Sequence, residues 1–206
     1  GMTAYFGLYD IGNPREGDVL VVSAAGGAVG TVVGQLGRLR GCHCIGLTST
    51  EDKADWLREE VGYHSALSRE RHPDLPAALA EAAPDGIDIF FDNVGGSVLD
   101  AALGHLRENS RLVLCGAIAQ YEASSPEPVY NTWELITKRA TASGFMFSDY
   151  ADRFPEAIAE LGRCLGDGSL RSFNRIYQGL EETPRAFCDM MHGASRGKCL
   201  VALEAD

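Results

Sequence analysis

The chain has 206 residues, of which 45% are hydrophobic and 23% charged, the proportions of an ordinary globular protein. Its formal net charge of −11 repels nucleic acid and anionic lipid alike, so neither is expected as a partner. The sequence has no apolar stretch of the roughly 20 residues that span a bilayer and no N-terminal secretion signal, which predicts a cytoplasmic protein with no membrane partner.

Short apolar runs alternate with helical patterns along most of the chain. We expect six strands, at Asp18–Ser23, His43–Leu47, Ser65–Leu67, Ile87–Asp92, Arg111–Cys115 and Ala140–Phe147. Apolar residues recur at helical spacing between them, in Val32–Leu39, Ala54–Val61 and Leu99–Leu106. This alternation predicts an α/β fold, a doubly wound parallel sheet of the Rossmann type in three layers, within a single domain over residues 1–206.

The last quarter of the chain has a different pattern. A helical stripe ends at Gly166-Asp-Gly168 and consists of Phe154, Ile158, Leu161 and Leu165. Thr183-Pro184 supplies an N-cap and a first-turn proline for a second helix. A final strand is expected at Lys198–Leu203, and Glu122–Pro128 reads as a loop over the carboxyl ends of the strands.

A run of small residues, Ser23–Gly30, lies where the first strand should pass into a helix. Without a side chain at Gly27, backbone N–H groups can approach a phosphate, and Gly30 lets the helix pack close to the sheet. This pattern predicts a pyrophosphate-binding turn, with a purely structural tight turn as the alternative.

The residues after the second strand bear on which dinucleotide is bound. From Gly27 through Thr50 there is no Asp or Glu, although an acidic residue in this region normally grips the ribose 2′-hydroxyl of NAD. The same absence argues against a methyltransferase. Glu51 and Asp52 come later and Lys53 follows them, which favours the 2′-phosphorylated cofactor NADP(H). The alternative for Lys53 is a solvated surface lysine neutralised by its acidic neighbours.

Polar and small residues also follow the fourth and fifth strands. Asn93-Val-Gly-Gly96 and Cys115-Gly-Ala-Ile118 should meet at the carboxyl edge of the sheet, where such folds bind ligands. They either line the nicotinamide end of a cofactor or simply turn the chain. No metal site is expected, because the six cysteines lack the paired spacing of zinc ligands. In Cys42-His43-Cys44, neighbouring side chains of a strand would point to opposite faces of the sheet and could not converge on one ion.

Several segments together resemble one family, the zinc-independent medium-chain dehydrogenases/reductases of the prostaglandin reductase and leukotriene B4 12-hydroxydehydrogenase type. The matching segments are Gly1–Gly7, Val21–Gly30 with Val33-Gly-Gln35, Phe90–Gly96, Cys115–Ile118 with Tyr121, Asp149-Tyr150 with Arg153-Phe-Pro155, and Gly197-Lys198. The resemblance extends over essentially the whole chain. It implies the NADP(H)-binding domain of an oxidoreductase that reduces the carbon–carbon double bond of α,β-unsaturated ketones or aldehydes.

The resemblance also assigns roles to individual residues. It places the pyrophosphate at Gly27, Ala28, Val29 and Gly30, and the 2′-phosphate at Lys53. The residues that it places around the nicotinamide half are Asn93, Cys115, Gly116, Ala117, Ile118, Tyr121, Phe145, Met146 and Phe147. Tyr121 is the candidate proton donor, with a structural or ribose contact as the alternative.

Two positions depart from the family pattern. Arg69 stands where the family has a tyrosine near the adenine ribose, and it could strengthen phosphate binding. Ser195 replaces an asparagine and keeps only part of its hydrogen-bonding capacity.

Family members also have a GroES-like domain before this one, and we expect it to be absent from this chain. The final strand, residues 198–204, would normally pack on that domain. The resemblance further implies a homodimer formed through the edge strand at residues 140–147. A stand-alone NADP(H)-binding module without turnover is the alternative to an enzyme domain.

Overall fold

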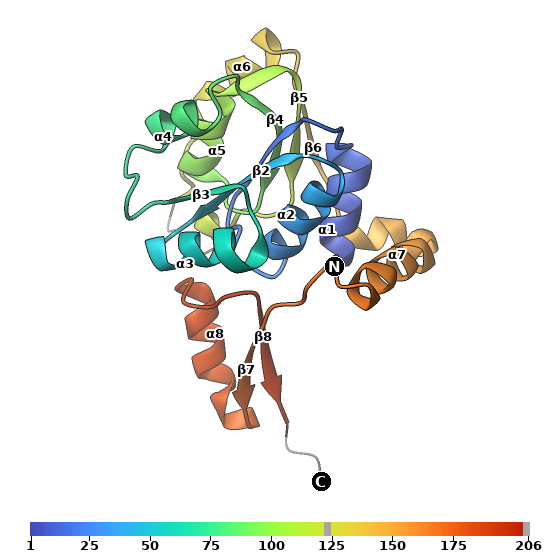
Figure 1. The fold of residues 1–206 in the computed structure, drawn as a ribbon. Helices are drawn as coiled ribbons and strands as arrows, with labels where there is room; N and C mark the ends of the chain where they lie inside the picture. Colours follow the sequence, from blue (N-terminus) through green and yellow to red (C-terminus); the bar gives the residue numbers. More distant parts are fainter. Residues whose placement is uncertain (122–124, 204–206) are drawn as a thin grey trace.

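The fold is built on a parallel sheet, seen in a computed structural model that describes residues 1–121 and 125–203 (Figure 1). Its strand order is β3-β2-β1-β4-β5-β6, and every pair is parallel. The strands are β1 Val19–Val22, β2 His43–Thr48, β3 Ser65–Ser68, β4 Ile87–Asp92, β5 Leu106–Leu114 and β6 Thr141–Gly144. The prediction of a six-stranded, doubly wound Rossmann sheet is confirmed. The order reverses between β1 and β4, which is where such sheets open a crevice for ligands.

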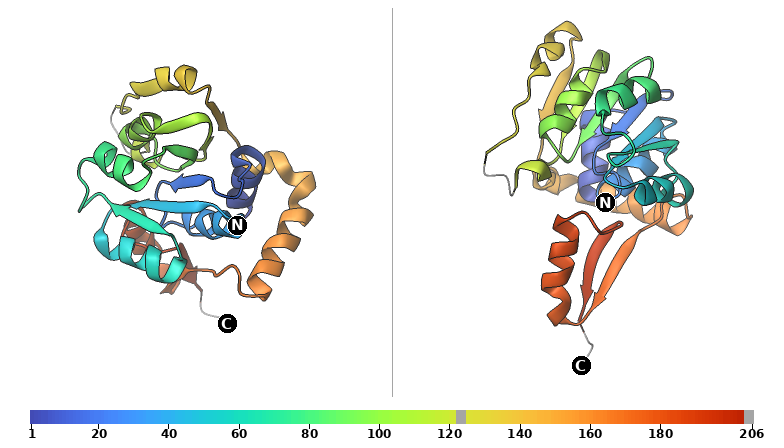
Figure 2. Two further views of the ribbon diagram at one scale, coloured as in Figure 1. Left: turned by 45° about the horizontal axis from the view of Figure 1, so that its top comes forward. Right: turned by 90° about the vertical axis from the view of Figure 1, so that its left-hand side faces the viewer.

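Helices cover both faces of this sheet and give three layers (Figure 2). Successive side chains of β1 point to opposite faces, so Leu20 and Val22 join one buried cluster and Val21 joins the other. The helices against the first cluster are α1 Met2–Phe6, α2 Gly30–Leu39, α3 Glu51–Trp56 and α7 Phe154–Gly166, and π-helical turns continue α1 to Gly12 and α3 to Val61. Against the second cluster lie α4 Leu75–Ala82, α5 Gly96–Leu103 and the short α6 Glu134–Thr137. None of the helices in the described ranges has the length and hydropathy needed to cross a bilayer.

The N-terminal segment is part of the core, which the sequence did not predict. Ala4, Phe6 and Leu8 are completely buried, and the Phe6 ring stacks on Tyr150 with 4.5 Å between ring centroids. Helix α1 is too short to show a helical period in the sequence. Its burial results from contacts with α2 and α7, which lie far away in the chain.

Four local expectations were wrong. The edge strand expected at residues 140–147 covers only Thr141–Gly144, and Phe147 begins a 3-10 helix. Leu106 does not belong to the preceding helix but opens β5, where it pairs with Ile87. Thr183 is the first helical residue of α8 rather than its N-cap, and its hydroxyl donates to the carbonyl of Leu180 at 2.7 Å. On α7, Ile158 is 62% exposed, because the buried face runs through Ala157, Leu161 and Cys164 instead. In α7 the helix itself was predicted correctly, but contacts with distant elements decided which side of it is buried.

The C-terminal part forms a separate β-α-β unit that projects from the main sheet (Figures 1 and 2). It consists of β7 Asn174–Gln178, α8 Thr183–Met191 and β8 Lys198–Ala202, and its two strands are parallel. The final strand was predicted, although residue 204 lies outside the described residues, whereas β7 was not. Residues 122–124 of the predicted loop are also outside them. Ile176 and Leu200, which pair in register, are 56% and 40% exposed, so one face of this small sheet is open.

Candidate functional site

The residues singled out from the sequence gather at one edge of the sheet, where the strands end. Backbone hydrogen bonds join the segments that leave neighbouring strands. Ser23 N–H donates to the carbonyl of Phe91 at 3.0 Å, and Cys115 N–H donates to that of Asp92 at 2.8 Å. On the other side, Arg69 N–H donates to the carbonyl of Thr48 at 3.0 Å. The sheet therefore brings together groups that lie up to about a hundred residues apart.

The turn Ser23–Gly30 is shaped by tight backbone contacts. Gly27 N–H donates to the carbonyl of Ala24 at 3.0 Å, and Ala24 itself has a left-handed φ of 47°. A Cβ on Gly30 would lie 2.6 Å from both the carbonyl oxygen of Ala24 and the Cα of Ala25, so only glycine fits. Helix α2 starts here without a side-chain cap. Thr31 and Val33 N–H donate to the carbonyls of Gly27 and Val29 at 3.0 Å, whereas the N–H groups of Ala28, Val29 and Gly30 donate to no backbone carbonyl of the described residues. This combination fits a pyrophosphate group.

A buried polar network lies beside the turn, and the sequence analysis did not identify it. Ser23 Oγ donates to Asp92 Oδ1 at 2.8 Å and accepts from Asn93 N–H at 2.7 Å. The Asn93 amide in turn donates to the carbonyl of Ser23 at 2.7 Å. Asp92 Oδ1 also accepts from the N–H groups of Val94 and Gly95 at 3.0 and 3.1 Å. The sequence does contain a signal for this network, because Ser23 and Asp92 each stand at the end of a buried apolar run.

Asp92 is 1% exposed, and its environment has two opposing effects. Burial disfavours the carboxylate, whereas the hydrogen bonds from Val94, Gly95 and Ser23 favour it. Burial is the larger effect and raises the pKa of Asp92. The network fixes the side chain of Asn93, which is thus held in one orientation at the switch point.

The segment after β5 lies next to Asn93. Gly116 N–H donates to the carbonyl of Asp92 at 3.1 Å, and Ile118 N–H donates to that of Asn93 at 3.2 Å. Tyr121 is 66% exposed, and its hydroxyl accepts from Ala117 N–H at a long 3.5 Å. Burial raises the pKa of Cys115 to about 11, so this thiol stays protonated at neutral pH.

The segment after β6 divides into two parts. Phe145 is half-buried and packs on the core, and a Cβ on Gly7 would lie 2.7 Å from its ring. Met146 and Phe147 are 63% and 44% exposed at the surface near this edge. The Phe147 ring stacks on Phe154 with 5.9 Å between ring centroids, so Met146 is the most exposed of the three side chains predicted to contact the nicotinamide.

Lys53 lies at the other end of the turn, in the first turn of α3. It is only 8% exposed, so it is not a solvated surface lysine. A Cβ on Gly26 would lie 3.8 Å from Lys53 Cδ, which places this side chain against the glycine-rich turn. Its ammonium group donates to the carbonyl of Gly193. Burial, and next the charge of Arg196, lower the pKa of Lys53.

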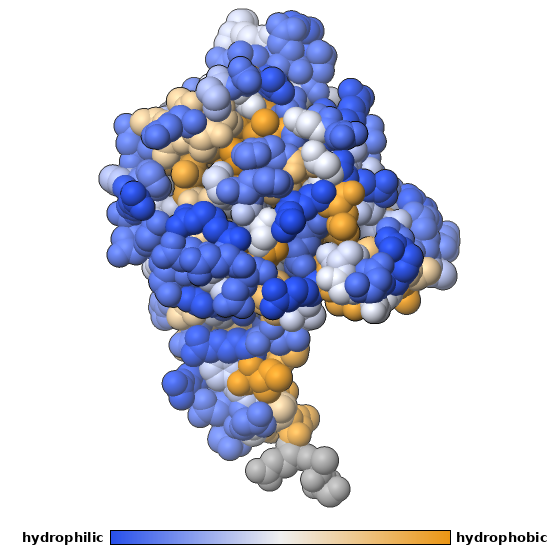
Figure 3. Space-filling view, in the orientation of Figure 1, coloured by the Kyte–Doolittle hydropathy of each residue, from blue (hydrophilic) through white to orange (hydrophobic). Residues whose placement is uncertain are grey.

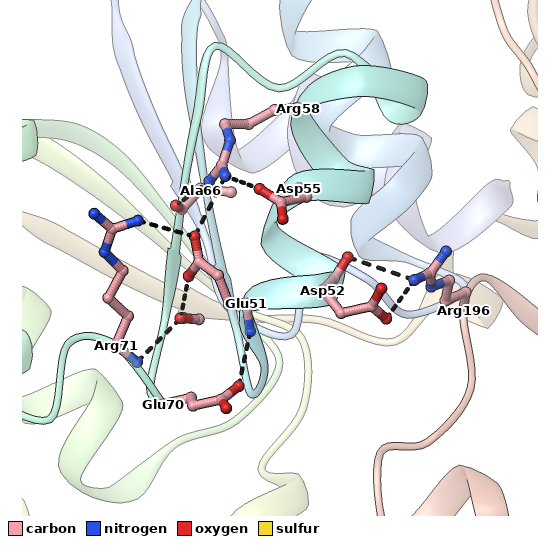
Figure 4. A network of polar contacts seen from close by, with 9 residues as sticks. Glu51, Asp52, Asp55, Arg58, Ala66, Glu70, Arg71 and Arg196 are labelled. Carbon is pink, nitrogen blue, oxygen red and sulfur yellow. Dashed lines mark hydrogen bonds and ion pairs between the residues drawn. The ribbon is translucent and has the colours of Figure 1, made fainter.

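The acidic neighbours of Lys53 have other partners, shown in Figure 4. Glu51 accepts from Ser68 Oγ at 2.6 Å and forms ion pairs with Arg58 and Arg71 at 3.4 Å. Asp52 forms an ion pair with Arg196. The side chain of Arg69 is exposed. Hydrogen bonds from Ser97 lower the pKa of Glu127, and the charge of Arg69 adds to this effect. Ser195 is 9% exposed within the turn that carries Arg196.

A parallel sheet in this strand order, with an uncapped glycine turn at its switch point, defines a dinucleotide-binding Rossmann domain. A family model described as "Zinc-binding dehydrogenase" matches residues 28–163. The chain belongs to that family, within its zinc-independent medium-chain dehydrogenase/reductase group. Despite the family's name, the described residues contain no group of three or more His, Cys, Asp or Glu that could hold a metal ion.

Individual relatives support the same assignment. The chain is 37% identical over 206 residues to the 2-alkenal reductase (NADP(+)-dependent) of Nicotiana tabacum, covering 100% of this chain and 60% of the relative. It is 36% identical over 203 residues to prostaglandin reductase 1 of Bos taurus, covering 98% and 61%. The solved structure of CurA from Vibrio vulnificus in complex with NADPH is 40% identical, with a TM-score of 0.94, covering 100% and 63%. The chain thus spans about 60% of the length of these relatives.

Proposed function

We propose that this chain is the NADP(H)-binding domain of an oxidoreductase that reduces the carbon–carbon double bond of α,β-unsaturated ketones or aldehydes. The observation that carries the proposal is that the buried Lys53 lies against the glycine-rich turn Ser23–Gly30, at the start of a helix without a side-chain cap. The names of the tobacco and bovine relatives, and the NADPH complex of the bacterial structure, support the cofactor and the reaction class.

In the proposed mechanism, each part of the edge binds one part of the cofactor. The turn Gly27–Gly30 binds the pyrophosphate through the N–H groups of Ala28, Val29 and Gly30, and Lys53 binds the 2′-phosphate. Asn93, held by Ser23, orients the nicotinamide end together with the segment after β5. When bound, NADPH supplies the hydride that the reduction needs.

Tyr121 is the proposed proton donor to the developing enolate, because its phenol is exposed beside Gly116 at this edge. In the enzyme with its full substrate cleft, Tyr121→Phe should lower kcat with little change in the KM for NADPH. An unchanged kcat would remove this role.

We further propose that a GroES-like domain, as in the family, completes the substrate cleft and packs on the C-terminal unit. A two-stranded parallel sheet is not expected to be stable with one face open, and Figure 3 shows apolar surface on this unit. Ile176, Leu180 and Phe187 are more than half exposed there.

If a GroES-like domain completes the substrate cleft, the 206-residue chain should bind NADPH without oxidising it when an enone is added, whereas a longer protein with the preceding domain should turn over. A stand-alone binding module instead predicts no turnover by either.

Lys53→Gln tests the cofactor assignment. We expect NADPH affinity to fall about tenfold to a hundredfold, because a charge-assisted phosphate contact is lost, while NADH affinity stays the same. Isothermal titration calorimetry of both cofactors measures this. Lys138→Gln, which removes the same charge at the far side of the sheet after α6, is the control. Equal NADPH and NADH affinities in the unchanged chain would contradict the assignment.

A homodimer through β6 and a cytoplasmic location complete the proposal. Strand β6 is an edge of the sheet, and Trp133 and Ile136 beside it are each 66% exposed. All six cysteines are free thiols, as is usual in a reducing compartment. Sedimentation velocity should give a dimer, and cell fractionation should place the protein in the cytoplasm. A monomer at micromolar concentration would contradict the dimer.

A further inference from the structure

The turn Gly193–Gly197 brings the C-terminal unit onto the proposed 2′-phosphate end of the site. Gly197 N–H donates to the carbonyl of Gly26 at 2.8 Å, and Gly197 forms a parallel bridge with Gly27. Lys53 donates to the carbonyl of Gly193, and a Cβ on Gly193 would lie 4.0 Å from Ser49 Oγ. The turn is therefore fixed to the glycine-rich turn, to α3 and to the end of β2.

The backbone on either side of Arg196 has little freedom. Gly197 has a left-handed φ of 72°, and a Cβ there would lie 2.0 Å from the carbonyl oxygen of Phe173. Ser195, on the other side, is buried. The Cα of Arg196 is thus held in place, and what can move is its long side chain.

That side chain carries its charge to the neighbourhood of Lys53. The guanidinium centre lies 5.5 Å from the centroid of the Trp56 ring, and Nη2 donates to the Asp52 carboxylate (Figure 4). A Cβ on Gly26 would be 3.7 Å from Trp56 and 3.8 Å from Lys53, so both side chains lie against the same part of the glycine-rich turn. The charge of Arg196 is also the largest charge effect that lowers the pKa of Lys53.

Asp52 is a weak partner for this arginine. The Asp52 side chain is 80% exposed and that of Arg196 is 39% exposed, and ion pairs this close to solvent contribute little. An incoming dianion could replace Asp52, since a guanidinium binds phosphate in a two-pronged geometry.

We propose that Arg196 is a second cation for the cofactor's 2′-phosphate and, with Lys53, determines the preference for NADP(H) over NAD(H). This inference rests on the proposed function and adds a residue that the sequence comparison did not single out. A phosphate between Arg196 and Lys53 relieves their mutual repulsion, and the arginine exchanges Asp52 for the phosphate.

The experiment uses 2′,5′-ADP and 5′-AMP as probes, which differ by the 2′-phosphate, and measures binding to the 206-residue chain by calorimetry. Arg196→Gln should weaken 2′,5′-ADP binding about fivefold to tenfold and leave 5′-AMP unchanged, with a smaller salt dependence. Asp52→Asn should strengthen 2′,5′-ADP binding, because it frees the guanidinium. Arg185→Gln, which removes an exposed charge elsewhere on the same unit, should change neither.

The outcomes separate this inference from the proposed function. If the unchanged chain prefers 2′,5′-ADP but Arg196→Gln binds it equally well, the role of Arg196 is wrong and the NADP(H) assignment stands. An effect confined to Arg69→Gln would likewise overturn it. If the unchanged chain binds both probes equally, or binds neither, the cofactor proposal fails and Arg196 fails with it. Circular dichroism of each variant checks that the fold is intact.

Discussion

Gly30→Ala should lower the free energy of unfolding by about 3 kcal/mol, because overpacking against rigid atoms forces the backbone to shift. The new Cβ would lie 2.6 Å from the carbonyl oxygen of Ala24 and from the Cα of Ala25. Both are backbone atoms, which cannot move aside as the end of a flexible side chain can. Since the same shift separates the turn from the start of α2, dinucleotide affinity should fall about a hundredfold. Urea unfolding and calorimetry with NADPH measure the two effects.

Gly162→Ala is the matched control. Gly162 lies inside helix α7, and a Cβ there has nothing within 4 Å. The same chemical change should therefore stabilise the chain by about 0.5–1 kcal/mol, since alanine is the better helix former, and leave NADPH binding unchanged. If both variants lose stability and binding equally, the close packing of Gly30 does not explain its effect.

Asp92→Ala should cost about 4 kcal/mol of unfolding free energy, because it leaves several buried donors without an acceptor. These donors are Ser23 Oγ and the N–H groups of Val94 and Gly95. Asp92→Asn should cost less, about 2 kcal/mol, because one oxygen remains. Asparagine still destabilises the chain, because Gly95 N–H lies 3.1 Å from both carboxylate oxygens of Asp92. In Asp92→Asn one of these oxygens becomes an NH2 group, which cannot accept this hydrogen bond. Urea unfolding of the variants checks this order.

The effect of Asp92 should depend on pH. Burial raises its pKa in the folded chain above the value of about 3.9 expected in the unfolded chain. Between these two values the folded state binds more protons, so the stability contributed by protonated Asp92 is complete below the unfolded pKa and is lost as the pH rises through the folded pKa. The stability advantage of the unchanged chain over Asp92→Asn should therefore shrink as the pH rises from about 4 through this window. An advantage that grows with pH would contradict the buried, raised-pKa description.

Much of the fold could be predicted because its signals are local. Parallel strands buried on both faces require continuous apolar runs such as Val19–Val22 and Ile87–Asp92, and these are visible in the chain. The glycine-rich turn was equally visible, since its spacing reports a backbone requirement. The short helix Met2–Phe6 and strand β7 were missed, because their burial and pairing depend on partners distant in the sequence.

The site was predicted in part for the same reason. The positions after each strand could be read from the sequence, and the structure places them at one edge. The sequence left Lys53 undecided between a phosphate contact and a solvated surface residue, and its 8% exposure decides against the second. Arg196 was not identified from the sequence, because residues 54–195 separate it from Lys53, its neighbour in space.

By itself, the sequence determined most of the strands, the glycine-rich turn and the family, because each depends on residues close together in the chain. The tertiary structure alone decided that Lys53 and Arg196 lie together beside the glycine-rich turn, that Ser23, Asp92 and Asn93 form one network, and that the C-terminal unit returns to Gly26. These features depend on packing between distant segments. The energy of a charge or a polar group is set by its surroundings in space, and periodicity along the chain does not contain that information.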